Sequence, residues 1–192
     1  MGRIIDITQE VFGSRVWPGD PEPVRTTVAA IADGAVCNVT AFSMCAHNGT
    51  HVDAPYHFLK DGKTIEQLDL DAFVGPCHVV RHTGNVTAAD AERFLQETGA
   101  ERLLIAGPAV ITAEAAKVFA AAELKLIGNE SQTVGPENAP MEVHLILLRA
   151  GVVILEGIVL TDVAAGEYFM NAAPLKLGGS DGAPCRAWLM EL

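Results

Sequence analysis

The segment His47-Asn48-Gly49-Thr50-His51-Val52-Asp53-Ala54-Pro55-Tyr56-His57 carries the strongest chemical signal in this sequence. It holds three of the six histidines of the chain, together with Asp53. Neutral imidazole and carboxylate groups are the ligands that Zn²⁺ and Mn²⁺ prefer in proteins. A single histidine would more often be a surface or capping residue, but three histidines and an aspartate at this density indicate a metal site.

The residues between the histidines favour a loop over a helix. His47 and His51 have the i, i+4 spacing of a helical metal pair. Gly49 and Pro55 disfavour a helix, as do the β-branched residues on both sides of His51. We therefore predict a loop in which Gly49 lets the backbone curl around an ion, because glycine adopts a positive φ at low cost.

An extended conformation also explains the order of the polar residues. His47, His51 and Asp53 are separated by even numbers of residues, so their side chains can point to one side of an extended chain. His57 lies four residues beyond Asp53. We interpret His57 either as a further ligand or as a proton donor and acceptor beside the ion.

Two isolated polar residues occur in apolar surroundings later in the chain. His144 sits in the middle of a largely apolar helix predicted over 140–150, and Glu156 ends the apolar run 152–155. Alone, such a histidine is more often a core residue with a hydrogen-bond partner. Burying a carboxylate in apolar surroundings costs free energy unless the carboxylate is paired. His144 and Glu156 therefore both need partners. One shared metal ion would provide a partner for each.

The remaining pattern predicts one α/β domain with a mixed sheet over residues 1–192. Helix caps are predicted at Thr87 and Thr112, with helix ends near Gly99 and Ala122, and Asp33-Gly34 is a hairpin turn signal. Strands outnumber helices, and no repeat or linker divides the chain. Strands are predicted at 4–7, 24–32, 36–44, 77–81, 102–105, 125–127, 152–155, 172–175 and 187–190.

Composition restricts the possible partners. The chain is 49% hydrophobic and 19% charged, with a formal net charge of −11, which disfavours nucleic acids and anionic membranes as partners. No apolar run is long enough to span a membrane. The four cysteines form no CxxC pair and are expected to be reduced, which favours a cytoplasmic location.

The glycine-rich segment 178–182 lacks the lysine of a phosphate-binding loop, so we interpret it as a tight loop near the site.

Taken together, these residues resemble the cyclase family, which includes bacterial kynurenine formamidase (arylformamidase) and isatin hydrolase. Residues 47–57 match the family motif His-x-Gly-Thr-His-x-Asp-x-Pro-x-His in full. The resemblance extends to Trp17-Pro18-Gly19-Asp20, to the pair His144 and Glu156, and to the segments 173–177 and 180–184.

The resemblance implies a ligand set and a fold. His47, His51 and Asp53 would hold one metal ion, and Asp53, His144 and Glu156 would hold a second. His57 would be the catalytic acid and base, and Trp17 the substrate contact. The implied cofactor is a divalent metal, Zn²⁺ before Mn²⁺, with one or two ions per chain. The implied fold is a swivelling β/β/α domain that assembles as a homodimer or homotetramer.

The activity implied by the resemblance is hydrolysis of a small-molecule substrate, N-formylkynurenine or a related N-formyl aromatic amine, by metal-activated water. Two stretches depart from the formamidase pattern. Residues 103–108 lack an expected Arg-Thr pair, and Asn129-Glu130 stands where an aspartate is expected. These departures favour a second hypothesis, hydrolysis of another small cyclic amide or imide such as an isatin-like substrate. A third hypothesis is a non-catalytic metal-binding protein, but His57 and Trp17 argue against it because neither is needed to hold metal.

Overall fold

A nine-stranded mixed sheet organises residues 2–192, the part of the chain that this computed structural model describes. The sheet has the strand order β1-β13-β11-β5-β7-β9-β10-β4-β12, and two short strand pairs, β2–β3 and β6–β8, lie outside it. The strands are β1 (Ile4–Asp6), β2 (Val24–Ala29), β3 (Val39–Ser43), β4 (His51–Asp53), β5 (Val74–Arg81), β6 (Gly84–Val86), β7 (Arg102–Ala106), β8 (Ala109–Ile111), β9 (Leu126–Asn129), β10 (Val153–Glu156), β11 (Gly166–Asn171), β12 (Gly182–Pro184) and β13 (Trp188–Glu191).

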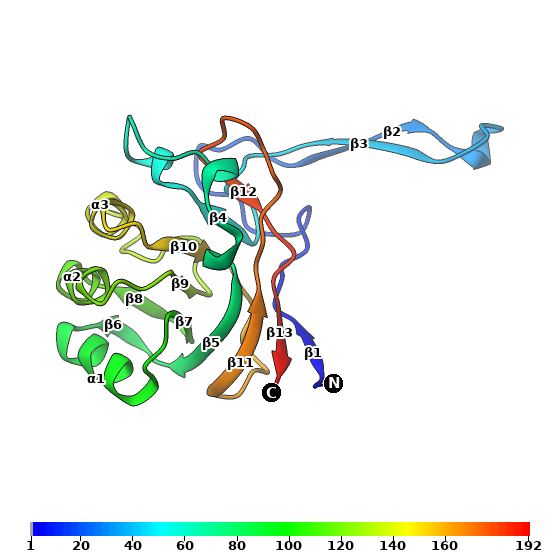
Figure 1. The fold of residues 1–192 in the computed structure, drawn as a ribbon. Coiled ribbons are helices and arrows are strands. Elements are labelled where there is room, and N and C mark those ends of the chain that lie inside the picture. Colours follow the sequence, from blue (N-terminus) through cyan, green and yellow to red (C-terminus); the bar gives the residue numbers. More distant parts are fainter. Residues whose placement is uncertain (1) are drawn as a thin grey trace.

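Three helices cover one face of the sheet, beside the parallel strands β5, β7, β9 and β10 (Figure 1). They are α1 (Ala88–Thr98), α2 (Ala113–Ala121) and α3 (Met141–Arg149). The predicted caps are confirmed, because the side chains of Thr87 and Thr112 each accept a backbone N–H three residues later. Helix α1 ends at Gly99, whose φ of +59° is the left-handed conformation that favours glycine at a helix end. The predicted α/β class with a mixed sheet is confirmed.

The sheet is curled, and it separates two apolar cores. In β7, Leu103 and Ile105 pack toward the helices, whereas Leu104 packs into the core on the opposite face. Successive side chains of a strand point to opposite faces of the sheet. Because both faces are covered here, every residue of β7 is buried, and the strand is apolar along most of its length. The second core lies between β5, β7 and β10 on one side and strands such as β11 and β13 on the other.

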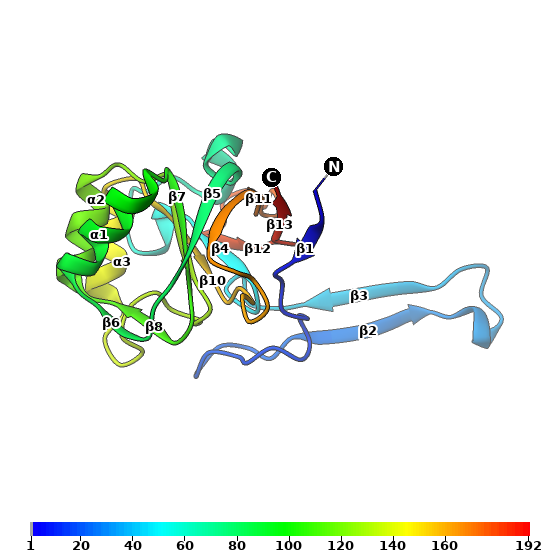
Figure 2. The ribbon, with the colours of Figure 1, turned by 90° about the horizontal axis from the view of Figure 1, so that it is seen from below.

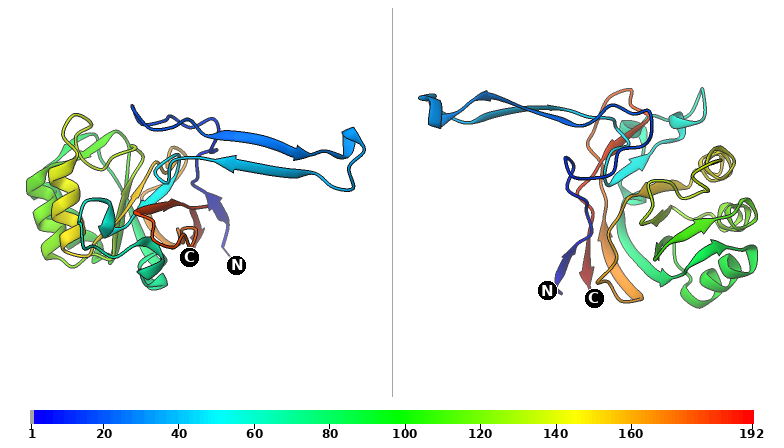
Figure 3. Two further views of the ribbon diagram at one scale, coloured as in Figure 1. Left: turned by 90° about the horizontal axis from the view of Figure 1, so that it is seen from above. Right: turned by 180° about the vertical axis from the view of Figure 1, so that it is seen from behind.

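A long hairpin formed by β2 and β3 projects away from the rest of the molecule (Figures 1, 2 and 3). Its turn contains the 3-10 segment η1 (Ile31–Asp33) and Gly34, whose φ is +88°. The predicted hairpin turn is confirmed, although both strands are shorter than predicted. All five residues of β3 and five of the six residues of β2 are exposed, so the two-stranded arm has no core of its own.

The structure differs from the predicted elements in several places, and the short pair β6–β8 was not predicted at all. The segment 47–57 is not only a loop: it contains β4 and the 3-10 turn η2 (Pro55–His57), because β10 and β12 supply backbone hydrogen bonds on both sides of β4. The strand predicted at 172–175 is wrong; the strand is β11, and Pro174, which has no backbone N–H, makes only an isolated bridge. Strand β12 was missed because Gly-Ala-Pro has low strand propensity.

Two short 3-10 segments, η3 (Ile65–Gln67) and η4 (Leu70–Ala72), connect the histidine segment to β5. None of the helices in residues 2–192 combines the length and the apolarity that crossing a membrane would require.

Candidate active site

Strand β4 brings together residues that lie far apart in the sequence. It pairs with β10 on one side and with β12 on the other, both antiparallel. In this register His51 lies opposite Glu156, and Asp53 lies opposite Gly182. The sheet therefore places the histidine segment between a ligand candidate at the end of β10 and the glycine-rich loop before β12.

Backbone geometry aims the side chains of the histidine segment to one side. His51 and Asp53 are two residues apart on β4, so both point to the same face. Gly49 has a φ of +67°, the positive φ that was predicted for the turn of the backbone within the histidine segment. The neighbouring Thr50 hydroxyl donates to the carbonyl of Gly157 at 2.6 Å, which anchors the turn to the end of β10.

Asp53 and Glu156 form a buried cluster with two histidines. Nε2 of His51 lies 3.5 Å from Oδ1 of Asp53 and 3.3 Å from Oε2 of Glu156. Nε2 of His144 lies 3.0 Å from Oε1 of Glu156 and 3.5 Å from Oδ2 of Asp53. Each of the four residues is at most 3% exposed. The structure thus brings His144 and Glu156 to the histidine segment, as the sequence predicted.

The tautomers of two histidines are fixed by backbone carbonyl groups. Nδ1 of His51 donates to the carbonyl of Gly49 at 3.0 Å, and Nδ1 of His144 donates to that of Pro140 at 2.8 Å. A carbonyl oxygen only accepts, so the proton of each neutral ring is on Nδ1. Nε2 of each ring therefore faces the carboxylates, and in the neutral ring it is the nitrogen whose lone pair is available to an ion. Proteins orient metal-ligating histidines in this way.

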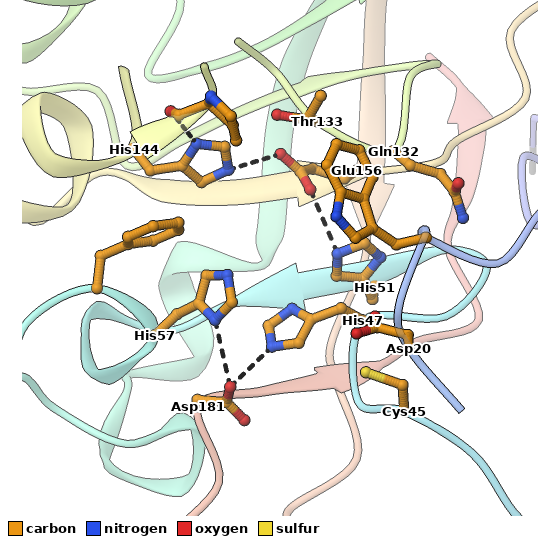
Figure 4. A pocket seen from close by; sticks show the side chains of 13 residues that line it. Asp20, Cys45, His47, His51, His57, Gln132, Thr133, His144, Glu156 and Asp181 are labelled. Carbon is orange, nitrogen blue, oxygen red and sulfur yellow. Dashed lines mark hydrogen bonds and ion pairs between the residues drawn. The ribbon is translucent and has the colours of Figure 1, made fainter. Parts of the chain in front are cut away.

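A second cluster is formed by His47, His57 and Asp181. Nδ1 of His47 donates to Oδ1 of Asp53 at 2.8 Å, and its Nε2 lies 3.0 Å from Oδ2 of Asp181. Nδ1 of His57 lies 3.2 Å from the same oxygen of Asp181 (Figure 4). One ligand atom each from His47, Asp53 and His57 lies within 4.8 Å of the other two, so the two histidines of this cluster have the spacing of an ion site together with Asp53, without Asp181.

The histidines and carboxylates shift one another's pKa values. Burial lowers the pKa of His47, but hydrogen bonds to Asp181 and Asp53 outweigh burial and raise this pKa to about 11. Burial likewise lowers the pKa of His144, and the nearby carboxylates of Asp53 and Glu156 raise it to about 10. Without an ion, protons balance the carboxylates. A divalent cation that binds here must displace them, so binding releases protons.

The residues fit a divalent metal. Two buried carboxylates lie side by side, and a buried charge without compensation costs several kcal/mol. Within residues 2–192, Oδ2 of Asp53 has no hydrogen-bond partner, and none of the residues that line the pocket is Lys or Arg. One ligand atom each from His51, Asp53 and Glu156 lies within 4.8 Å of the other two. Imidazole nitrogens and carboxylate oxygens are donors that zinc and manganese accept.

The two clusters form the floor of a pocket of about 380 Å³ (Figure 4). Trp17, predicted as the substrate contact, lies on its wall, as does Phe58. Phe58 also packs against the rings of His57 and His144, with centroid distances of 4.4 and 5.0 Å. The pocket further includes residues to which sequence reasoning gave no role in the site: Asp20, Cys45, Gln132, Thr133, Pro140 and Asp181.

Asp181 is the most important of the residues that sequence reasoning missed. The glycine-rich segment 178–182 was predicted to be a tight loop near the site, but its carboxylate was not singled out. Hydrogen bonds from His47 and His57 hold the pKa of Asp181 well below its usual range. The available signal was an aspartate between serine and glycine in a loop, which is also a common turn sequence, so its function could not be separated from turn formation.

Replacing Gly182 with alanine is expected to disturb both the sheet and the site. A Cβ at Gly182 would lie 2.7 Å from the carbonyl oxygen of Val52 and 2.7 Å from Cε1 of His47. Such overpacking costs about 1–3 kcal/mol, and relief would require His47 to move. The free energy of unfolding, measured with a denaturant, should fall, and the metal content of the purified protein should fall as well. Gly178→Ala is the matched control, because a Cβ there meets nothing within 4 Å. If Gly182→Ala and Gly178→Ala had the same free energy of unfolding and the same metal content, the predicted clash at Gly182 would be contradicted.

Comparisons with known proteins agree with this geometry. Residues 5–136 match the Cyclase family ("Putative cyclase"). Kynurenine formamidase from Salinibacter ruber is 36% identical over 210 residues, which cover 98% of this chain and 97% of that protein. The kynurenine formamidase from Delftia acidovorans is also 36% identical, over 205 residues that cover 99% and 98%.

Solved structures share the fold over the whole chain. A potential metal-dependent hydrolase with cyclase activity has a TM-score of 0.84 at 28% identity, covering 100% of this chain and 99% of its own. Isatin hydrolase A from Labrenzia aggregata has a TM-score of 0.84 at 23% identity, covering 98% and 93%, which shows a common fold. Since the family match spans most of the chain and the formamidases align over nearly all of it, the chain belongs to the Cyclase family.

Proposed function

We propose that this chain is an arylformamidase-like enzyme that hydrolyses N-formylkynurenine or a related N-formyl aromatic amine. The bond cleaved is then a carbon–nitrogen bond other than a peptide bond. The observation that carries the proposal is that Trp17 and Phe58 line the same pocket as the cluster of histidines and carboxylates. An aromatic ring that stacks on these side chains would present its amide to the cluster.

The proposed cofactor is Zn²⁺, with Mn²⁺ as the alternative and one or two ions per chain. His47, His51 and Asp53 would hold one ion, and Asp53, His144 and Glu156 would hold the other. When bound, such ions lower the pKa of a coordinated water and polarise a carbonyl group. Asp53 belongs to both groups of candidate ligand atoms, so its carboxylate would contribute to holding either ion.

His57 and Asp181 are proposed to move the proton that the leaving amine needs. His57 is about a quarter exposed, whereas His51 and His144 are buried, so its ring faces the open part of the pocket. Its Nδ1 is held by Asp181, which leaves Nε2 free toward a substrate. An amine leaves poorly unless it is protonated, and a histidine at this position can supply that proton.

Hydrolysis of N-formylkynurenine by protein loaded separately with Zn²⁺ and with Mn²⁺ tests the proposal. Turnover with one ion that a chelator abolishes would support it and identify a working metal. Turnover of isatin or another cyclic amide in place of the formamide would support the second candidate, which the altered segments 103–108 and 129–130 favour. Absence of any turnover, in protein confirmed to carry metal, would leave a metal-binding protein without catalysis.

We further propose that the hairpin arm β2–β3 joins two copies of this chain. A two-stranded hairpin in water is at best marginally stable, and this one exposes Val28 (62%), Val36 (100%) and Phe42 (58%). Of residues 24–43, only Arg25 and Asp33 are charged, in a chain of net charge −11. Depletion of charge together with exposed apolar side chains is typical of the core of an interface.

A groove at the base of the arm supports the proposal that the partner is a second copy of this chain, because the groove could receive the arm of that copy. The groove has a volume of about 750 Å³, and its lining combines apolar side chains with polar and charged ones. The apolar ones include Phe42, Met44, Leu175 and Trp188, and the charged ones are Asp6, Glu10 and Arg186. Arm and groove lie on the same chain, so two copies can exchange arms around a twofold axis. Such an exchange closes at two subunits, which is the commonest symmetry of oligomers.

Val28→Glu is expected to convert the dimer into a monomer, because the charge would have to be buried at the interface. Light scattering during size exclusion would show half the wild-type mass, with an unchanged circular dichroism spectrum. Leu70→Glu is the control, since Leu70 is 68% exposed on η4 in the body of the protein. A monomeric wild type, or a Val28→Glu variant of unchanged mass, would contradict the proposed arm exchange.

A further inference from the structure

Thr133 lines the wall of the pocket, and its hydroxyl group is buried there without a hydrogen-bond partner among the residues described. Thr133 is only 3% exposed, and its Oγ1 has no hydrogen-bond partner within residues 2–192. A buried hydroxyl without a partner costs about 1–3 kcal/mol. Thr133 lines the same pocket as Trp17 and the metal-ligand candidates, and it lies beside Glu156 in the close-up (Figure 4). A group that enters the pocket can supply the missing partner.

The backbone around Thr133 is fixed on both sides. The Asn129 side chain donates to the carbonyl of Thr133 at 3.4 Å and to that of Ala109 at 3.2 Å. The next residue, Val134, donates its backbone N–H to Oε1 of Glu156 at 2.7 Å and accepts a hydrogen bond from Ile111. Thr133 therefore stands on a rigid loop that is bonded directly to a metal-ligand candidate.

Glu156 does not need the hydroxyl of Thr133. Its Oε1 already accepts from Val134 and pairs with His144, and its Oε2 faces His51 at 3.3 Å. The carboxylate thus has partners on both oxygens, whereas the hydroxyl beside it has none. What the hydroxyl can offer is an O–H donor in a pocket where none of the lining residues described is Lys or Arg.

We propose that Thr133 is a catalytic residue that donates a hydrogen bond from Oγ1 to the carbonyl oxygen of the substrate. This inference rests on the proposed function, since it assigns a contact at the reacting carbonyl. Negative charge develops on that oxygen when water adds to the carbon. A donor held in place before the reaction stabilises that charge without any cost of reorganisation.

Thr133→Val removes the hydroxyl and keeps the shape, and Thr133→Ser keeps the hydroxyl. With metal-loaded protein and N-formylkynurenine, Thr133→Val should lower kcat on the order of 100-fold with little change in KM. Thr133→Ser should retain most of the wild-type kcat. Metal content should be equal in all three proteins. A raised KM with unchanged kcat, equal losses in both variants, or loss of metal from Thr133→Val would each overturn the proposal.

A second readout separates this proposal from the proposed function. Binding of ¹³C-formate to the metal-loaded proteins, followed by NMR, places an oxygen anion in the pocket without any turnover. Thr133→Val should bind formate roughly tenfold more weakly than the wild type, as expected for loss of one hydrogen bond to an anion. If the wild type hydrolyses no formamide but this difference is found, the substrate is wrong and the donor role stands. Equal formate affinity in Thr133→Val and wild type overturns the donor role.

Discussion

Asp53→Asn is expected to abolish metal binding and to lower turnover at least about a thousandfold, because a metal-dependent step supplies most of the rate. The carboxylate of Asp53 lies 2.8 Å from His47 and 3.5 Å from both His51 and His144, so it is shared by both candidate clusters. Asparagine has the same shape but carries no charge. It therefore removes the one anion that both ions would share.

Metal content by elemental analysis, together with turnover, checks this expectation. Asp20→Asn is the matched control, because Asp20 also lines the pocket but belongs to neither cluster of candidate ligands. The control should keep its metal. Full metal content in Asp53→Asn would show that the ions are not centred on this carboxylate, and the assignment of both clusters would fail.

His57→Ala is expected to reduce kcat by a factor of about 10² to 10⁴, the usual contribution of a general acid or base, with metal content near that of the wild type. The reason is that His57 is held by Asp181 at the open side of the pocket, where it can reach a leaving amine. Added imidazole should restore part of the rate, since the deleted ring leaves space for it.

The same variant also tests the other reading of His57. One ligand atom of His57 lies within 4.8 Å of those of His47 and Asp53, so a role as a ligand is geometrically open. Loss of metal from His57→Ala, without rescue of turnover by imidazole, would make His57 a ligand. In that case the proton would have to come from another group of the pocket.

The ligand candidates could be predicted from the sequence for two reasons. Either their spacing along a short stretch fixes their direction, or burying them without a partner would cost free energy. His51 and Asp53 alternate along a strand, so their common direction follows from spacing alone. Glu156 follows a buried apolar run, where an unpaired carboxylate would be expensive. In each case one short stretch of sequence contains the whole physical reason.

Other features of the site could not be predicted because they depend on contacts between distant segments. Asp181 acquires its role only when β12 pairs with β4, and Gly-Ala-Pro gives no sign of a strand. Thr133 looks like any loop threonine until the structure shows that its hydroxyl is buried without a partner. Likewise, the hairpin was predicted, but not its projection from the body, since alternation within a strand does not say what the strand packs against.

The position of β4 between β10 and β12 has a consequence for how the protein matures. Synthesis proceeds from the N-terminus, so the histidine segment emerges from the ribosome well before Glu156 and long before Asp181. Strand β4 gains its second hydrogen-bonded neighbour only when Gly182–Pro184 arrives, near the end of the chain. Strand β4 is therefore hydrogen-bonded on one side only until β12 has been made, and a chain that stops before Glu156 would lack one of the candidate ion ligands.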